Sequence, residues 1–160
     1  MEGLLHVSYY DDYNNLIKEF DIHNNLTTNG ANYILNNFFR GFASSPNWYI
    51  GMISVSSESL GIHIDDTMAS HEWTEYPDAS GNRQRFFTSI ADSSNLEVRS
   101  TSEVTFTLGF LGGVSMYGIF VTNKEAYNDN SGVLLSVSNF IGTEAPHVGY
   151  TLRVNYTYRM

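Results

Sequence analysis

The chain of 160 residues contains no cysteine, which excludes disulfide bonds, cysteine-ligated zinc and thiol catalysis together. It is also poor in positive charge, since 8 Lys and Arg stand against 17 Asp and Glu and the net charge is −9. A protein of that charge is repelled by polyanions unless it carries a local basic patch, and the sequence shows none. We therefore expect no binding to nucleic acid or to an anionic membrane.

Long apolar runs are missing as well, and none reaches the ~20 residues that a membrane-spanning helix needs. The N-terminal segment has no basic residue ahead of its short apolar stretch, so it does not match a secretory signal. We expect one domain over residues 1–160, made in the cytoplasm of its host without export. A domain of this length buries roughly 70% of the surface that its unfolded chain exposes, so it needs no metal or disulfide to fold.

Aromatic residues and glycine are plentiful, with 11 Tyr, 10 Phe and 13 Gly, whereas only 16% of residues are charged. Aromatic and β-branched side chains suit half-buried strands, and glycines suit the turns between them. The composition therefore predicts an all-β protein. About eight strands are expected among short alternating or apolar segments at 4–10, 16–22, 48–56, 85–90, 96–100, 103–109, 114–123, 133–140 and 151–159.

One short helix is predicted near residues 30–40, where apolar residues recur at i, i+3, i+4, i+7 and i+8: Ala31, Ile34, Leu35, Phe38 and Phe39. Thr28 or Asn29 is expected to cap its start, and Gly41 to end it. Because no β-α-β rhythm follows, an antiparallel two-sheet sandwich or jelly roll is the expected architecture. The first two strands flank DDYNN, so residues 1–24 are expected to form an N-terminal hairpin or arm.

The segment DDTMASHEWTE (65–75) concentrates polar side chains around a tryptophan, and these residue types allow three catalytic interpretations. A zinc-protease H-E-x-x-H motif fails because Glu75 stands where the second histidine belongs. A triad of Ser70, His71 and Asp65 or Asp66 lacks a nucleophile elbow and an oxyanion loop. A carboxylate pair of Asp66 with Glu72 or Glu75 could serve a glycosidase, but paired acids are common on acidic surfaces. We therefore predict no catalytic residue, no metal and no cofactor.

A structural interpretation accounts for more of the same residues. Asp65 or Asp66 would cap a short helical turn over residues 67–69, and Trp73 would insert under the sheet with Met68 beside it. Ser70 and His71 would satisfy backbone groups that the loop leaves unpaired. The predicted structural motif consists of Asp66, Thr67, Met68, Ser70, His71, Trp73 and Glu75.

Six segments stand in order along the chain: NLTTNGANYIL (25–35), WYIGMI (48–53), DTMASHEWTE (66–75), MYGIFVTN (116–123), GVLLSVSNF (132–140) and GYTLRVNY (149–156). In this order and content the chain resembles a group of small structural proteins of tailed bacteriophages. The D-T-M-A-S-H core is the most specific part of the resemblance. The chain departs from the group's pattern in lacking a glycine before Trp73 and in having Met52 in place of leucine.

The resemblance implies a non-enzymatic virion protein on the phage particle surface, in the first place a capsid decoration or cement protein. Its expected partners are the major capsid protein or other virion proteins and further copies of itself, with a trimer favoured. A head- or tail-fibre component and a carbohydrate-binding module for receptor attachment are the alternatives. Aromatic side chains in or beside loops would make the partner contacts in these cases, and the candidates are Tyr9, Tyr10, Tyr13 and Tyr127, with Trp48 as a further sugar-stacking candidate. A hydrolase using Asp66, His71 and Glu75 is the third hypothesis.

Overall fold

The computed structural model describes residues 2–40, 47–55, 62–89, 92, 94–109, 115–144 and 147–159. These residues form ten strands and one helix: β1 (Glu2–Tyr10), β2 (Leu16–Leu26), α1 (Thr28–Arg40), β3 (Trp48–Val55), β4 (Thr74–Tyr76), β5 (Gln84–Phe86), β6 (Glu97–Arg99), β7 (Val104–Thr107), β8 (Ser115–Thr122), β9 (Leu134–Glu144) and β10 (Thr151–Arg159). The prediction of a mostly β protein with one short helix near residues 30–40 is confirmed. β4 was not predicted, because three residues are too short to show a period.

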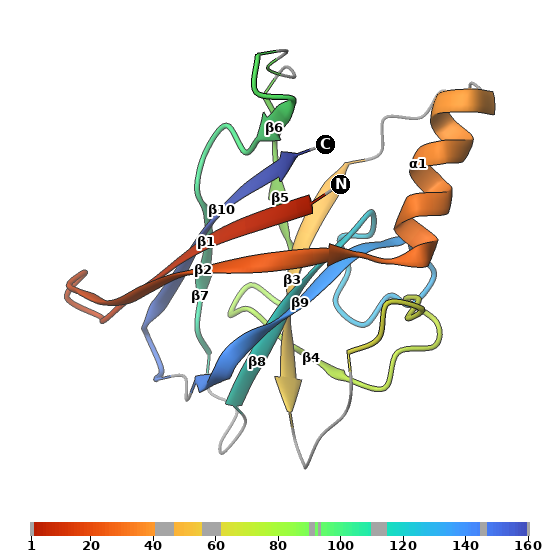
Figure 1. Ribbon diagram of the computed structural model, residues 1–160. Helices are drawn as coiled ribbons and strands as arrows, with labels where there is room; N and C mark the ends of the chain where they lie inside the picture. Colours follow the sequence, from red (N-terminus) through yellow and green to blue (C-terminus); the bar gives the residue numbers. More distant parts are fainter. Residues whose placement is uncertain are drawn as a thin grey trace.

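The strands form one antiparallel sheet in the order β4-β3-β8-β9-β2-β1-β10-β6, with β5 paired to β3 and β7 paired to β10. The strand β2 joins the two halves of this sheet (Figure 1). Most of β2 pairs with β1, from Leu16 opposite Tyr10 to Asn24 opposite Gly3. Its last two residues pair with β9. The described residues thus show a single open sheet rather than the two sheets of the predicted sandwich or jelly roll.

The N-terminal hairpin lies inside this sheet. β1 pairs with β10 over its whole length, from Glu2 opposite Arg159 to Tyr10 opposite Thr151. Leu5 and Val7 of β1 are fully buried. β1 and β2 are thus paired with each other as part of the sheet.

The two halves of the sheet share one hydrophobic core. Its cluster takes Leu5 and Val7 from one half and Ile50, Met52 and Ile119 from the other. Contacts also cross directly between the halves. The rings of Phe86 on β5 and Tyr156 on β10 meet at 5.4 Å between centroids, and the hydroxyl of Tyr76 donates to the carbonyl of Gly109 at 2.6 Å.

The helix α1 is fastened at its first turn. The hydroxyl of Thr27 accepts a hydrogen bond from Gly30 N at 3.0 Å, so Thr27 is the N-cap and the prediction of Thr28 or Asn29 was wrong. Asn29 instead accepts a hydrogen bond from Leu134 N, and Thr28 donates to Asp65. A Cβ at Gly30 would lie 2.1 Å from the carbonyl oxygen of Leu135, so only glycine allows the helix to approach β9 this closely. The predicted C-terminal Gly41 lies outside the described residues.

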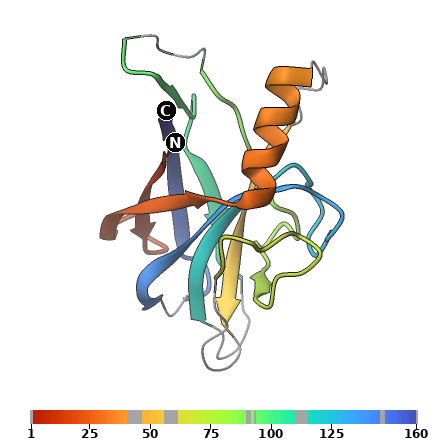
Figure 2. The same ribbon diagram turned by 45° about the vertical axis from the view of Figure 1, so that its right-hand side comes forward.

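Beyond its first turn, α1 projects away from the sheet (Figures 1 and 2). The predicted apolar stripe therefore does not face the core along its length. Ile34 is partly buried, but Leu35 is 53% exposed and Phe39 is 75% exposed. An amphipathic pattern predicts that a helix has an apolar face, and it does not tell what covers that face.

Candidate functional site

The segment 65–75 folds into a tight turn that leads into β4. The hydroxyl of Thr67 accepts a hydrogen bond from Ala69 N and pairs with the hydroxyl of Ser70 at 2.9 Å. The carboxylate of Asp66 accepts a hydrogen bond from His63 N at 3.0 Å. Asp66 therefore closes the turn that precedes it. The turn over residues 67–69, which Asp65 or Asp66 was expected to cap, is capped by Thr67 instead.

Trp73 and Met68 lie together in a small buried cluster with Ile53, Phe120, Leu134 and Val137. Trp73 is 2% exposed, and its ring meets that of Phe120 at 4.7 Å between centroids. The cluster is distinct from the main core and contains residues of β3, β8 and β9. Trp73 thus attaches the loop to the sheet, which is the position that the structural interpretation expects of an anchor.

His71 stacks on Trp73, with ring centroids 3.6 Å apart and planes 10° from parallel. Its Nδ1 lies 2.8 Å from the carbonyl oxygen of Trp73, where it donates a hydrogen bond as the neutral tautomer. Burial lowers the pKa of His71, and the hydrogen bond to Trp73 acts in the opposite direction. Among the described residues Ser70 bonds to Thr67 and not to His71, so the two are not arranged as nucleophile and base.

Glu75 forms a buried ion pair with Arg83. The Nε and Nη2 atoms of Arg83 donate to the two carboxylate oxygens at 2.8 and 2.9 Å, and the side chains are 1% and 4% exposed. This two-point geometry is the strongest form of an arginine–carboxylate contact. Sequence reasoning missed the pair. The spacing of eight residues gave no signal, because the loop between them sets the contact.

The same ion pair also holds the loop between β8 and β9. Arg83 donates from Nη1 to the carbonyl of Lys124 at 3.1 Å and to that of Asp129 at 3.3 Å. Glu75 accepts a hydrogen bond from Asn128 N at 2.8 Å. Tyr127 donates its hydroxyl to the carbonyl of Glu75 at 3.1 Å. Glu75 is therefore committed to internal contacts and is not available as a catalytic acid or base partner for Asp66.

The predicted contact aromatics have different surroundings. Tyr9 is 6% exposed and packs on Tyr150 at 5.5 Å between ring centroids, so it belongs to the core. Tyr10 is half-buried under the guanidinium of Arg153, and Tyr127 is half-buried against β4. Tyr13, at the tip of the β1–β2 hairpin, is 81% exposed. Of the four, Tyr13 is the residue with an open aromatic face.

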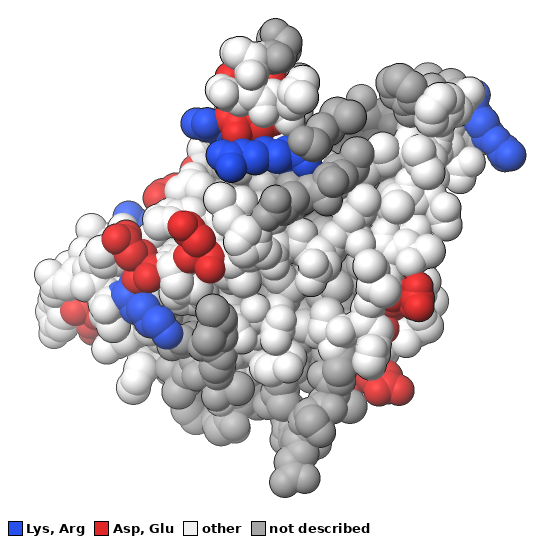
Figure 3. All heavy atoms as spheres, in the orientation of Figure 1, with Lys and Arg blue, Asp and Glu red and all other residues white. Residues whose placement is uncertain are grey.

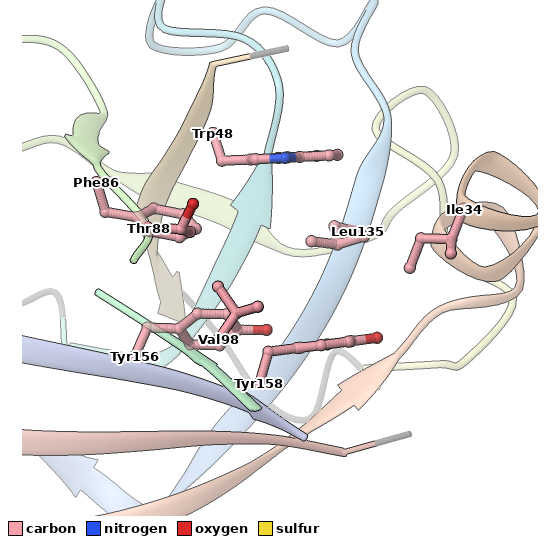
Figure 4. Close-up of a pocket in the computed structure, with 8 residues that line it drawn as sticks. All are labelled: Ile34, Trp48, Phe86, Thr88, Val98, Leu135, Tyr156 and Tyr158. Atoms are coloured by element: carbon pink, nitrogen blue, oxygen red, sulfur yellow. The ribbon is translucent and has the colours of Figure 1, made fainter. Parts of the chain in front are cut away.

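An apolar pocket of about 250 Å³ lies between α1 and the β6–β10 end of the sheet. Figure 4 shows the rings of Trp48 and Tyr158 on opposite sides of it, with Leu135 and Ile34 toward the helix. Burial raises the pKa of Tyr158 to about 12, and its hydroxyl has no hydrogen-bond partner among the described residues. The pocket can take a flat apolar group.

In the described ranges no group of three His, Asp or Glu side chains is placed to hold a metal ion. No helix in the part of the chain that the structure describes is long and apolar enough to cross a membrane. Among known proteins, no family model and no curated protein matches the chain.

Proposed function

We propose that the chain is a non-enzymatic structural protein of a tailed-phage virion, most specifically a capsid decoration or cement protein on the particle surface. The proposal rests on the internal contacts that the side chains of segment 66–75 make. This segment provides the most specific part of the resemblance, and its side chains make internal contacts: Trp73 and Met68 in a buried cluster, Glu75 in the ion pair with Arg83. Side chains that hold a loop in place suit a scaffold better than a reaction centre.

The chemistry of the loop supports the same view. An acid–base or nucleophilic mechanism needs two groups within hydrogen-bond reach and open to a substrate. The candidates Asp66, His71 and Glu75 each bond to a different internal partner: His63 N, the Trp73 carbonyl and Arg83. A hydrolase built on these three residues would have to break those contacts first.

The proposed role is mechanical, and it relies on contacts between copies and with the major capsid protein. Closed rings of identical subunits, with a trimer favoured, repeat one contact around a symmetry axis. Exposed apolar surface lies on α1, where the side chain of Leu35 is more than half exposed. A chain of net charge −9 has no general affinity for a nucleic acid or an anionic membrane, so protein partners fit it best.

In its finer architecture we propose a β-sandwich variant, in which β2 continues from one layer into the other. The supporting observations are the shared core and the contact of Phe86 with Tyr156, which joins strands from different halves of the sheet. Nuclear Overhauser contacts between these two rings in solution test the arrangement. Their absence in the folded protein would contradict a two-layer packing.

Immunogold electron microscopy of purified particles tests the location. Labelling at regular sites over the head is the result expected for a decoration protein. Labelling confined to the tail or to fibres would support the fibre alternative, and unlabelled particles would contradict a virion role.

The carbohydrate-binding alternative is favoured by the pocket that Trp48 and Tyr158 line, since aromatic rings stack on the apolar faces of sugars. A glycan array probed with the wild-type chain and with Trp48→Ala separates the two functions. A decoration protein is expected to bind no glycan. Binding that the wild type shows and Trp48→Ala lacks would favour the receptor-binding function instead.

A further inference from the structure

Two arginines share one buried carboxylate at the end of β10. Glu97 on β6 is 3% exposed, and the Nε of Arg159 donates to its Oε2 at 2.9 Å. Arg99 bonds to the other oxygen of Glu97. The hydrogen bond from Arg159 contributes most to holding the pKa of Glu97 below its usual range, so the carboxylate is ionised at neutral pH. Two guanidinium groups and one carboxylate leave a net charge of +1 on a protein whose total is −9.

These guanidinium groups are accessible. The side chain of Arg159 is 54% exposed and that of Arg99 is 60% exposed, and with Asn95 and Glu97 they line a polar groove of about 370 Å³. Arg159 uses only Nε on Glu97, and its two terminal amino groups have no partner in the described part of the chain. Figure 3 shows Lys and Arg side chains gathered below the lobe that carries β6. The planar guanidinium group of an arginine can bind a carboxylate through two parallel hydrogen bonds.

The β1–β2 hairpin ends in a rigid acidic tip. The carboxylate of Asp11 accepts hydrogen bonds from Tyr13 N at 3.0 Å and Asn15 N at 2.7 Å, and Asn14 adopts a left-handed backbone conformation with φ of 64°. These contacts fix the loop, while Asp12 is exposed and Tyr13 is 81% exposed. A pre-organised loop that displays a tyrosine loses little conformational entropy when it binds.

The tip and the groove lie at opposite ends of the same strand pair. Tyr10 pairs with Thr151 next to the tip, and Arg159 pairs with both Glu2 and Glu97 at the groove. Eight residue steps along β10 separate the two ends, which is roughly 27 Å at the rise of an antiparallel strand. Figure 1 shows the hairpin tip extending to the left, away from the C-terminus. The tip of one chain therefore cannot reach its own groove.

We propose that the acidic hairpin tip of one copy docks in the Arg99–Arg159 groove of a second copy. The carboxylate of Asp12 would pair with the free amino groups of Arg159, and the ring of Tyr13 would stack on a guanidinium group. Such a contact is head-to-tail, so it repeats from copy to copy and closes into a ring or continues as a filament. This inference deepens the oligomeric role under the proposed function and rests on it.

Charge reversal tests the contact by sedimentation equilibrium of the purified full chain. At low salt the wild type is expected to show a concentration-dependent mass above the 18.0 kDa of one chain, and this association should weaken in salt. Asp12→Lys and Arg159→Glu should each weaken association by about tenfold or more. The double variant should restore it, because lysine then faces glutamate at every contact. Glu72→Lys, a charge reversal of the same sign on an exposed residue of the loop before β4, serves as the control and should associate as the wild type does.

Tyr13→Ser tests association without disturbing the fold, because it changes an exposed residue of the tip and leaves the hydrogen bonds of Asp11 that hold the turn. It should weaken association while circular dichroism and the thermal midpoint stay unchanged. A wild type that remains at 18.0 kDa would overturn the proposal, and so would tip variants that associate normally. If the monomeric chain still binds particles, the proposed virion function stands and the groove's acidic partner is another protein.

Discussion

Removing the guanidinium of Arg83 should be among the most destabilising single changes in the molecule. The side chain is 1% exposed, and it supplies both donors to Glu75 and further hydrogen bonds to the carbonyls of Lys124 and Asp129. Arg83→Met keeps the length of the side chain but leaves a buried carboxylate without its partner. Breaking a buried pair in this way costs about 3–5 kcal/mol.

Urea unfolding followed by tryptophan fluorescence and circular dichroism measures this loss. For a domain of this size the change corresponds to a fall of about 6–20 °C in the thermal midpoint. Arg85→Met is the matched control, because Arg85 lies two residues away with an exposed side chain over Phe87. It should cost under about 1 kcal/mol. If Arg83→Met were no more harmful than Arg85→Met, the pair would not hold the loops together.

Three further predictions concern the buried ring and the titrating groups. Trp73→Ala should lower the free energy of unfolding by about 3–5 kcal/mol, because the ring is 2% exposed; a loss in urea unfolding below about 1 kcal/mol would contradict its anchoring role. Since the pKa of Glu97 is held below its ordinary 4.5, its ion pairs contribute stability that is fully present above pH 4.5 and is lost as the pH falls below it. Thermal midpoints should therefore fall more steeply with acid in the wild type than in Glu97→Gln, and parallel curves would refute the effect. Because burial lowers the pKa of His71 below 6.5, protonation favours the unfolded chain, and stability declines as the pH falls through this range. An NMR titration that places the pKa of this imidazole at or above 6.5 in the folded protein would contradict the effect of burial.

The alternating strands could be read from the sequence because their burial follows the side-chain period directly. In β7, Val104 and Phe106 are buried while Thr105 and Thr107 are exposed, as a period of two requires. β10 repeats the pattern with Leu152, Val154 and Tyr156 buried. The composition and the strand periods together were enough for the β class of the fold.

Features that depend on tertiary placement could not be read in the same way. The Glu75–Arg83 pair arises where a loop returns to β4, and no local pattern marks it. The cap of α1 is Thr27 because this residue also reaches the carbonyl groups of β9, a contact 107 residues away in sequence. The single continuous sheet depends on where β2 changes partner, which strand periods do not reveal.

The copy number of the chain in purified particles tests the central claim most directly. Quantitative mass spectrometry against the major capsid protein provides the ratio. A decoration protein predicts a fixed stoichiometry to the capsid protein, with copies on the order of hundreds per particle, as repeated symmetric contacts over a shell require. A few copies per particle would move the chain to a fibre or tail position, and its absence from purified particles would contradict the virion function.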